Sequence, residues 1–264
     1  GASNNVIRGL TILRAKGTAI VANDWKGTLE DCVITDIQDG GATNATCVFY
    51  YTGNNGRPIT FSGCSVTGIT SATRHAIRFD AGPTGALTLT NCLFRNVSLS
   101  LQQFDKNLGF IGTLGLAYGQ AYSLYFYDCV FEDVSFRGYD PSNENGMFGS
   151  WYYPMVFERC AFRNIASTNG GGYCSIISCN RNSTTLRNCL FQNCKPGAGR
   201  AAVSGFWSDV RAYNCTFDAI SNGVFRPLPL GTETIRAYNS TITSSESLAT
   251  ANGTYLYLNY VDLF

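Results

Sequence analysis

The sequence has few charged residues and no long apolar run. Charged residues make up 14% of the 264-residue chain, against about 25% in an ordinary soluble domain. Its 19 basic and 18 acidic residues nearly cancel, so the composition shows no basic surface of the kind that binds nucleic acid or an anionic membrane. No apolar run approaches the roughly 18 residues that span a bilayer, which excludes an integral helical membrane protein.

Helical periodicity is also missing. Long stretches of Ala, Leu, Glu and Lys at helical spacing do not occur, whereas the frequent Gly, Asn, Thr and Tyr residues favour turns and strands. The 13% aromatic content argues against a disordered chain. The chain begins at Gly1 with no visible signal peptide, which indicates a mature or trimmed chain.

A degenerate repeat runs along the whole chain and indicates a solenoid. A typical copy is Leu89-Thr-Asn-Cys92-Leu-Phe94, and successive copies are 21 to 37 residues apart. Helical repeats do not tolerate such variable spacing, but strands joined by turns do, because extra residues enter the turns. The ten residues at the cysteine position are Leu10, Cys32, Cys64, Cys92, Cys129, Cys160, Cys189, Cys215, Ser240 and Val261.

Within each copy, apolar residues alternate with polar ones, which predicts strands. A phenylalanine stands two residues after the cysteine position in five copies, and an Asn or Asp often stands four residues after it. We expect both to form stacked columns, and we expect the Asn/Asp column to turn inward and hydrogen-bond to the neighbouring coil. Further strands are expected between the copies, at 18–21, 46–50, 75–79, 109–111, 146–148, 175–177, 201–203 and 223–225.

The pattern resembles that of the right-handed parallel β-helix proteins, the superfamily that includes pectate lyases. The Asn-Cys-x-Phe-x-Asn form, as in 91–96, carries this resemblance. It implies an all-β, right-handed parallel β-helix of about ten coils with three short strands each, formed as a single domain by residues 1–264. It also implies secretion or display at the cell surface. The fold hosts lyases, hydrolases, adhesins and phage tailspikes, so it does not set the activity.

Eleven cysteines are an odd number, so at least one thiol is unpaired within the chain. Seven lie at the repeat position, where we expect a buried stack of small apolar thiols. Zinc requires convergent tetrahedral ligands, so a linear column predicts no metal site. A Cys174–Cys179 disulfide across a turn stays open as an alternative.

Six Asn-x-Ser/Thr sequons occur in the chain. Asn44, Asn182 and Asn252 fall in expected turns, which makes them the candidate glycosylation sites. Asn96 belongs to the Asn/Asp column and is expected to be inaccessible.

The signatures of the enzymes with this fold are missing. The chain has neither the Asp-Asp pair and Gly-His-Gly of polygalacturonases nor the Arg-x-Pro-x-x-Arg of pectate lyases. The remaining catalytic candidates lie in two long insertions that stacked coils would place side by side. Lys106 or Arg137 would act as the base, and Asp105, Asp140 and Glu144 would hold Ca²⁺ for a lyase. The alternative is that these are solvated loop charges. No other cofactor is indicated.

Aromatic residues recur at the expected outward positions of the strand before the cysteine. Aromatic faces stack on sugars and fill protein interfaces, although tyrosine is also simply favourable on an exposed sheet. The candidate carbohydrate-binding residues are Tyr125, Tyr127, Trp151, Tyr152 and Tyr153.

The apolar repeat continues into both ends of the chain with no amphipathic helix to cover them. A β-solenoid with open edges is expected to stack head to tail, unless the chain is a piece of a longer β-helix. The candidate assembly residues are Ile7, Leu10 and Ile12 in the first coil and Leu256, Leu258, Val261 and Leu263 in the last.

These observations favour an extracellular structural or adhesive β-solenoid that associates end to end and has a polysaccharide as a second candidate partner. The alternative function is that of a polysaccharide lyase or glycoside hydrolase acting on an acidic polysaccharide. Neither nucleic acid nor a membrane span is expected.

Overall fold

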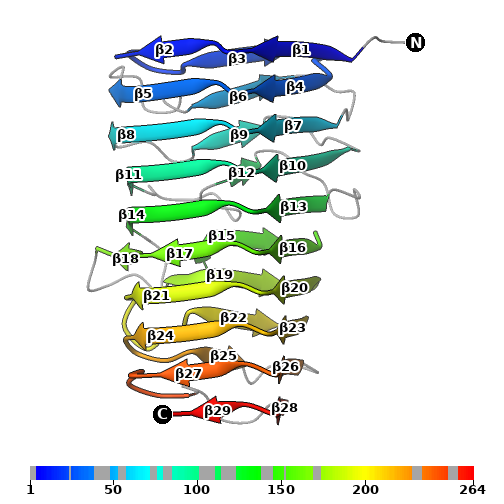
Figure 1. Ribbon diagram of the computed structural model, residues 1–264, viewed down its shortest axis with the longest axis vertical. Helices are drawn as coiled ribbons and strands as arrows, with labels where there is room; N and C mark the ends of the chain where they lie inside the picture. The colour runs from blue at the N-terminus through cyan, green and yellow to red at the C-terminus, as the bar shows by residue number, and fades with distance from the viewer. Residues whose placement is uncertain are drawn as a thin grey trace.

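The computed structural model is an all-β stack of parallel coils, with no helix among the residues that it describes. Figure 1 shows the coils as successive rungs, with the first and last coils at opposite ends of the stack. Neighbouring coils pair in parallel, as Ile7 does with Leu29. The predicted parallel β-helix is therefore confirmed. The described residues are 4–23, 25–38, 48–52, 58–71, 76–79, 85–100, 111–113, 123–137, 145–151, 153–168, 174–227, 234–248 and 255–264.

One side of the stack, which we call the first sheet, contains ten strands of the described chain. The inner strands contribute alternating buried and partly exposed side chains, as expected for a sheet with one face on the core, whereas the outermost strands are mainly exposed. In order, these strands are β1 (Asn5–Arg8), β4 (Gly27–Glu30), β7 (Ile59–Ser62), β10 (Ala86–Thr90), β13 (Ser123–Tyr127), β16 (Met155–Glu158), β20 (Ser183–Arg187), β23 (Asp209–Tyr213), β26 (Thr234–Tyr238) and β28 (Tyr255–Asn259).

The next side, the second sheet, follows the cysteine position in each coil. Its strands are β2 (Thr11–Leu13), β5 (Val33–Gln38), β8 (Ser65–Ser71), β11 (Leu93–Ser100), β14 (Val130–Arg137), β17 (Ala161–Arg163), β21 (Leu190–Cys194), β24 (Thr216–Ile220), β27 (Thr241–Thr243) and β29 (Asp262–Leu263). A short strand, β18 (Ala166–Ser167), also pairs with β14.

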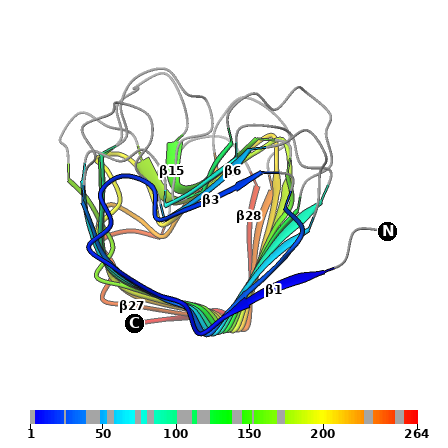
Figure 2. The ribbon, with the colours of Figure 1, turned by 90° about the horizontal axis from the view of Figure 1, so that it is seen from above.

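Two separate four-stranded sheets close the third side, and Figure 2 shows the resulting three-sided cross-section. All eight strands expected between the repeat copies are confirmed, with ends shifted by a few residues. They are β3 (Ile20–Asn23), β6 (Phe49–Thr52), β9 (Ile77–Phe79) and β12 (Ile111–Thr113) in one sheet, and β15 (Asn145–Trp151), β19 (Cys174–Asn180), β22 (Val203–Phe206) and β25 (Phe225–Pro227) in the other.

The strand register stacks like residues on like in the core. The phenylalanine column Phe94, Phe131, Phe162, Phe191 and Phe217 is continuous through four neighbouring pairs. Successive ring centroids are 5.5, 5.3, 4.5 and 4.9 Å apart, and the rings are within 15° of parallel. All five side chains are completely buried, so the predicted phenylalanine column is confirmed.

The coils turn at two corners, and each corner is formed by a single residue with a left-handed backbone. The residue just before the cysteine position has φ between 46° and 67° in all ten coils, and the residue four positions after it has φ between 50° and 69° in nine. Asn, Asp and Gly adopt this conformation most readily. The first corner is made by Gly9, Asp31, Gly63, Asn91, Asp128, Arg159, Asn188, Asn214, Asn239 and Tyr260.

The Asn/Asp column of the second corner faces outward, so the expected inward placement, including that of Asn96, is wrong. Asn96, Asp133, Asn164 and Asn193 are exposed, because a left-handed corner residue directs its side chain away from the coil. The side chains hydrogen-bond along the column. Asn164 Nδ2 donates to Asp133 Oδ1 at 2.8 Å, and Asn193 Nδ2 donates to Asn164 Oδ1 at 2.8 Å.

We expect Asn164→Ala to lower the free energy of unfolding by about 1–2 kcal/mol, because alanine is disfavoured at the φ of 53° and the variant loses both column hydrogen bonds. Asn164→Gly loses the same hydrogen bonds but tolerates the backbone. Urea denaturation of the two variants separates these causes. Equal stability of the alanine and glycine variants would contradict a role for the left-handed backbone.

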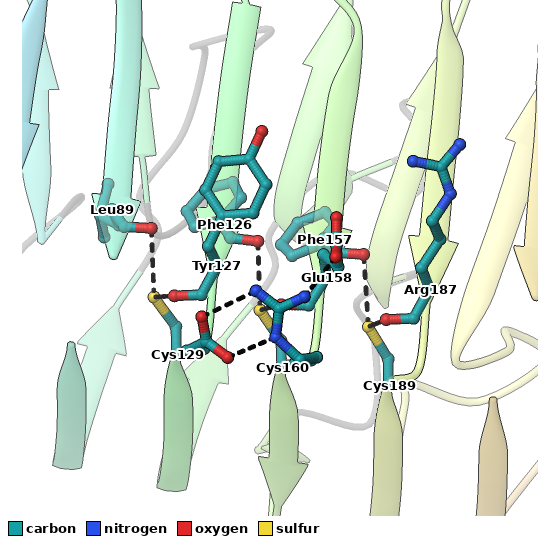
Figure 3. A network of polar contacts seen from close by, with 11 residues as sticks. Leu89, Phe126, Tyr127, Cys129, Phe157, Glu158, Cys160, Arg187 and Cys189 are labelled. Carbon is teal, nitrogen blue, oxygen red and sulfur yellow. Dashed lines mark hydrogen bonds and ion pairs between the residues drawn. The ribbon is translucent and has the colours of Figure 1, made fainter. Parts of the chain in front are cut away.

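The repeat cysteines form a column of buried thiols. In Figure 3, each thiol lies close to the carbonyl two residues before it and to a carbonyl of the preceding coil. Cys160 Sγ, for example, donates toward Glu158 O at 3.5 Å and Phe126 O at 3.4 Å. Ser240 takes the same position and donates to Tyr238 O at 3.0 Å. Each such thiol thus links the first corner of its own coil to the backbone of the preceding coil.

Cys174 and Cys179 lie on the same strand, β19. Five residues along a strand separate their Cα atoms by about 16 Å, far beyond disulfide range. The alternative of a Cys174–Cys179 disulfide is therefore wrong.

Alkaline pH should destabilise the protein through its buried thiols. Burial raises the pKa of Cys179 and of Cys194 from 9.0 to about 12. The unfolded chain therefore loses these protons first, and stability that is complete below pH 9 falls as the pH rises toward 12. At pH 10 we expect a loss of about 1 kcal/mol for each thiol.

The matched variant for this prediction is Cys194→Val, because Ile220 occupies the equivalent position in the next coil. Urea denaturation between pH 8 and 10, measured against the wild type, should give a shallower decline of stability for the variant. An identical decline would show that Cys194 does not contribute.

Candidate saccharide-binding face

The outer face of the first sheet changes character along the stack. Thr and Ser predominate on its early strands, whereas Tyr and Arg predominate from β13 onward. One outward column in register is Thr28, Thr60, Thr88, Tyr125, Val156, Thr185, Arg211, Arg236 and Tyr257, and the next is Glu30, Ser62, Thr90, Tyr127, Glu158, Arg187, Tyr213, Tyr238 and Asn259. We use the name Tyr–Arg face for Arg187, Asp209, Arg211, Tyr213, Arg236, Tyr238, Tyr255 and Tyr257.

Paired tyrosine rings provide flat aromatic surface on this side of the molecule. Tyr213 and Tyr238 stack across neighbouring strands, with centroids 5.0 Å apart and an 8° angle between the rings. Tyr255 and Tyr257 stack along β28 at 6.0 Å, and both are exposed. Sugar rings present apolar C–H faces that pack on aromatic surfaces of this kind.

Three arginines from adjacent strands lie among the tyrosines. The guanidinium carbon of Arg187 lies 5.9 Å from the centre of the Tyr213 ring, and that of Arg236 lies 5.7 Å from the centre of the Tyr257 ring. Arg211 and Arg236 both pair with the Asp209 carboxylate. These contacts hold the arginines at defined positions without burying them, because the Arg211 side chain stays 50% exposed.

The charges of this group do not cancel. Arg211 and Arg236 share the carboxylate of Asp209, and Arg187 adds a third guanidinium on the neighbouring strand β20, which leaves positive charge on a protein whose net charge is only +1. The side-chain hydrogen bond with Asp209 and its charge raise the pKa of Arg211, so that the guanidinium is a cation at neutral pH. An anionic group therefore finds exposed, oriented guanidinium donors here.

Arginines elsewhere on the first sheet and its corner are matched by carboxylates. Arg8 pairs with Glu30 at 2.6 Å. Arg159 pairs with Asp128 at 2.6 Å and also with Glu158. The hydrogen bond with Arg159 lowers the pKa of Asp128. Among the described residues of this sheet, the excess of arginines over carboxylates therefore lies on β20, β23 and β26.

The five predicted carbohydrate-binding residues lie in different environments in the structure. Tyr125 and Tyr127 project outward from β13 with parallel rings 6.2 Å apart. Burial raises the pKa of Tyr127, so its hydroxyl stays protonated at neutral pH. Tyr153 is only 5% exposed and burial raises its pKa to about 12, so its expected position on the surface is wrong. Trp151 is the last residue of β15, but its side chain lies outside the described part of the structure, as does the whole of Tyr152.

The catalytic candidates fall largely outside the described part of the chain. Lys106, Asp105, Asp140 and Glu144 all lie there, and Arg137 is described only as the last residue of β14. Within the described residues, no group of three His, Cys, Asp or Glu side chains converges as a metal site would require. The lyase arrangement, with its Ca²⁺, therefore stays an untested prediction.

No helix in the described ranges is long and apolar enough to cross a membrane.

Of the three candidate glycosylation sites, Asn44 and Asn252 lie outside the described residues. Asn182 lies on the turn before β20 and is half-buried. Its Nδ2 donates to Asn180 O at 3.2 Å, and its Oδ1 accepts from Thr184 Oγ1 at 3.2 Å. The amide of Asn182 therefore helps to form the turn in the folded protein.

The candidate assembly residues line the two outermost coils. Ile7, Leu10, Leu258 and Leu263 are exposed. Ile12, Leu256 and Val261 are partly buried and pack against the core. Beside the first coil, an apolar cavity of about 220 Å³ is lined by Ile7, Ile20, Val21, Ala22, Asn23, Trp25 and Phe49.

Sequence reasoning missed the arginines of the Tyr–Arg face, although a signal for them was present. Arg211 and Arg236 stand two residues before Tyr213 and Tyr238, so the same alternation that predicts outward tyrosines predicts outward arginines. The shared partner Asp209 is visible only in the register of β23 and β26, which sets Arg211 beside Arg236.

A scan against protein-family models finds no match, and no curated protein matches the chain. Among solved structures, the chain is similar to the crystal structure of the periplasmic alginate epimerase AlgG, with 9% sequence identity and a TM-score of 0.33. The similarity covers 98% of this chain and 76% of that one. At this level it carries no information about activity, and the parallel β-helix architecture of the chain is established by its own repeat and strand register.

Proposed function

We propose that this chain is an extracellular, non-enzymatic adhesive β-solenoid that binds an acidic polysaccharide along its Tyr–Arg face. The observation that carries the proposal is the combination of stacked tyrosines, of which Tyr255 and Tyr257 are exposed, with two arginines that share one carboxylate. Aromatic rings pack on the C–H faces of pyranoses, and guanidinium groups donate two parallel hydrogen bonds to carboxylate or sulfate.

The shape of the face favours a polymer over a small molecule. Its side chains are spread over four adjacent strands of a sheet, and neighbouring strands are about 4.8 Å apart. A small ligand requires a concave pocket that buries most of its surface. A long chain instead gains affinity by making modest contacts with many rungs at once.

The test is to measure binding of the purified chain to a polyuronate, a sulfated polysaccharide and a neutral polysaccharide of similar length. We expect both anionic polymers to bind with an affinity that falls at high ionic strength, and the neutral polymer to bind much more weakly. Equal binding of the neutral polymer, or none of any polymer, would overturn the proposal. The release of unsaturated sugars or reducing ends would support the alternative of a lyase or hydrolase.

A second proposal, end-to-end association, is favoured by the matching registers of the outermost coils. Extending the pairing β26–β28 by one rung sets Leu258 against Ile7 of a second copy, and extending β27–β29 sets Leu263 against Ile12. The left-handed corners Tyr260 and Gly9 then coincide. Both contacts join apolar residues through unpaired strand edges, the geometry of strand addition.

Val261→Lys combined with Leu263→Lys should abolish such association, because it inserts charge into an apolar contact while the inner coils keep theirs. Light scattering and negative-stain microscopy at matched concentration give the readout. Wild-type protein that stays monomeric at high concentration, or a double variant that assembles as readily as the wild type, would refute end-to-end association.

A further inference from the structure

Trp207 occupies a backbone conformation that is unfavourable for a bulky residue. It lies on the turn between β22 and β23 with φ of 47°. A large side chain is unfavourable in this left-handed region, and the corner imposes it in successive coils, because Arg181 at the equivalent position of the preceding coil has φ of 53°. Such strain persists where the surrounding structure imposes it, often at functional sites.

Burial of the ring does not account for the strain. Trp207 is 39% exposed, whereas its neighbour Ser208 is only 5% exposed. The ring is instead held in place by two contacts. The Arg181 guanidinium carbon lies 4.3 Å from its centre, and the Phe206 ring lies at 4.3 Å with a 47° tilt. The Arg181 amide also donates to Phe206 O at 2.9 Å, which ties the two turns together.

The ring lies at the edge of the Tyr–Arg face. Trp207 stands two residues before Asp209, the carboxylate shared by Arg211 and Arg236. Ser208 between them is buried, and Trp207 is 39% exposed on the turn that leads into β23. An exposed indole, a guanidinium stacked on it and two further arginines therefore lie along one edge of the sheet.

We propose that Trp207 is the platform of a terminal subsite on which one pyranose ring of an acidic polysaccharide stacks, with its carboxylate directed to the arginines beside Asp209. The inference rests on the proposed function. It adds two points to that function: the binding face ends at Trp207, and the sugar units of the ligand are uronates. Arg181 serves as a positioning residue that fixes the plane of the indole.

Trp207→Asn tests the platform, because asparagine suits the left-handed backbone but offers no aromatic surface. Calorimetric titration with an oligogalacturonate should show an affinity at least tenfold lower than that of the wild type, while the melting temperature stays unchanged or rises. Trp207→Phe, which keeps an aromatic ring, should bind within about threefold of the wild type. Ligand addition should also shift the tryptophan emission of the wild type and leave that of Trp207→Asn unaltered.

The outcomes separate this inference from the proposed function. Wild-type binding that Trp207→Asn leaves unchanged would overturn the platform alone. A much lower melting temperature of Trp207→Asn would also overturn it, by showing that the strained ring has a structural role. If the wild type binds no anionic polymer, the proposed function fails and the platform with it.

Discussion

Phe162→Ala should lower the free energy of unfolding by about 3–5 kcal/mol, the largest stability effect among the variants proposed for this protein. Phe162 is completely buried and stacks between Phe131 at 5.3 Å and Phe191 at 4.5 Å. It also meets Phe148 and Phe157 edge to face. Alanine leaves a cavity in the middle of the column, which the rigid coils on both sides cannot fill.

Phe162→Leu is the matched control. Leucine keeps most of the buried volume, and we expect it to cost roughly half as much as alanine because it loses the ring contacts but leaves a smaller cavity. Urea denaturation followed by circular dichroism measures both variants. A loss below about 1 kcal/mol for Phe162→Ala would contradict the continuous aromatic core.

Combined replacement of Arg211 and Arg236 by glutamine should weaken binding of an acidic polysaccharide about 100-fold. Hydrogen bonds to charged groups contribute about 1.5 kcal/mol or more each, which corresponds to roughly tenfold for each arginine. The two lie in register on β23 and β26, so that one anionic group can engage both. The same double variant leaves the Asp209 carboxylate without either cation, which adds repulsion.

Two further variants make this experiment specific. Asp209→Asn should strengthen binding by roughly threefold, because it removes a competing anion from a solvent-exposed site where a charge pair contributes little. Arg163→Gln, on the outer face of the second sheet, should leave the affinity unchanged. Titration calorimetry gives the dissociation constants, and melting temperatures confirm that each variant is folded. If the Arg211 and Arg236 double variant binds as tightly as the wild type, the guanidinium groups are not the anion contacts.

The Tyr–Arg face was only half predictable from the sequence. Strand alternation sets Tyr213 and Tyr238 outward, and the same rule holds for Arg211 and Arg236. Their convergence on Asp209 depends on how β23 and β26 are registered, which brings together residues 25 or more positions apart in the chain. Trp207 carried no sequence signal, since its importance lies in a backbone angle.

Tyr153 and the Asn/Asp column mark two different misreadings of the sequence. Tyr153 stands two residues before Met155 and continues the inward alternation of β16, so it is buried with Met155 and Phe157. Asn164 lies at a corner with φ of 53°, and one left-handed residue redirects its side chain in a way that no polarity pattern reports.

The architecture was determined by the sequence alone, because each coil of a solenoid packs on its neighbours through the same few positions. The recurrence of Cys and Phe at a spacing of two residues is sufficient to define the strand, its inward face and its register with the next coil. The outer surface follows no such rule, since outward side chains are not required to match. Only the tertiary structure decided which of them meet: Arg211 and Arg236 come from successive coils, and the stacking of those coils brings both to the Asp209 carboxylate, two residues after Trp207.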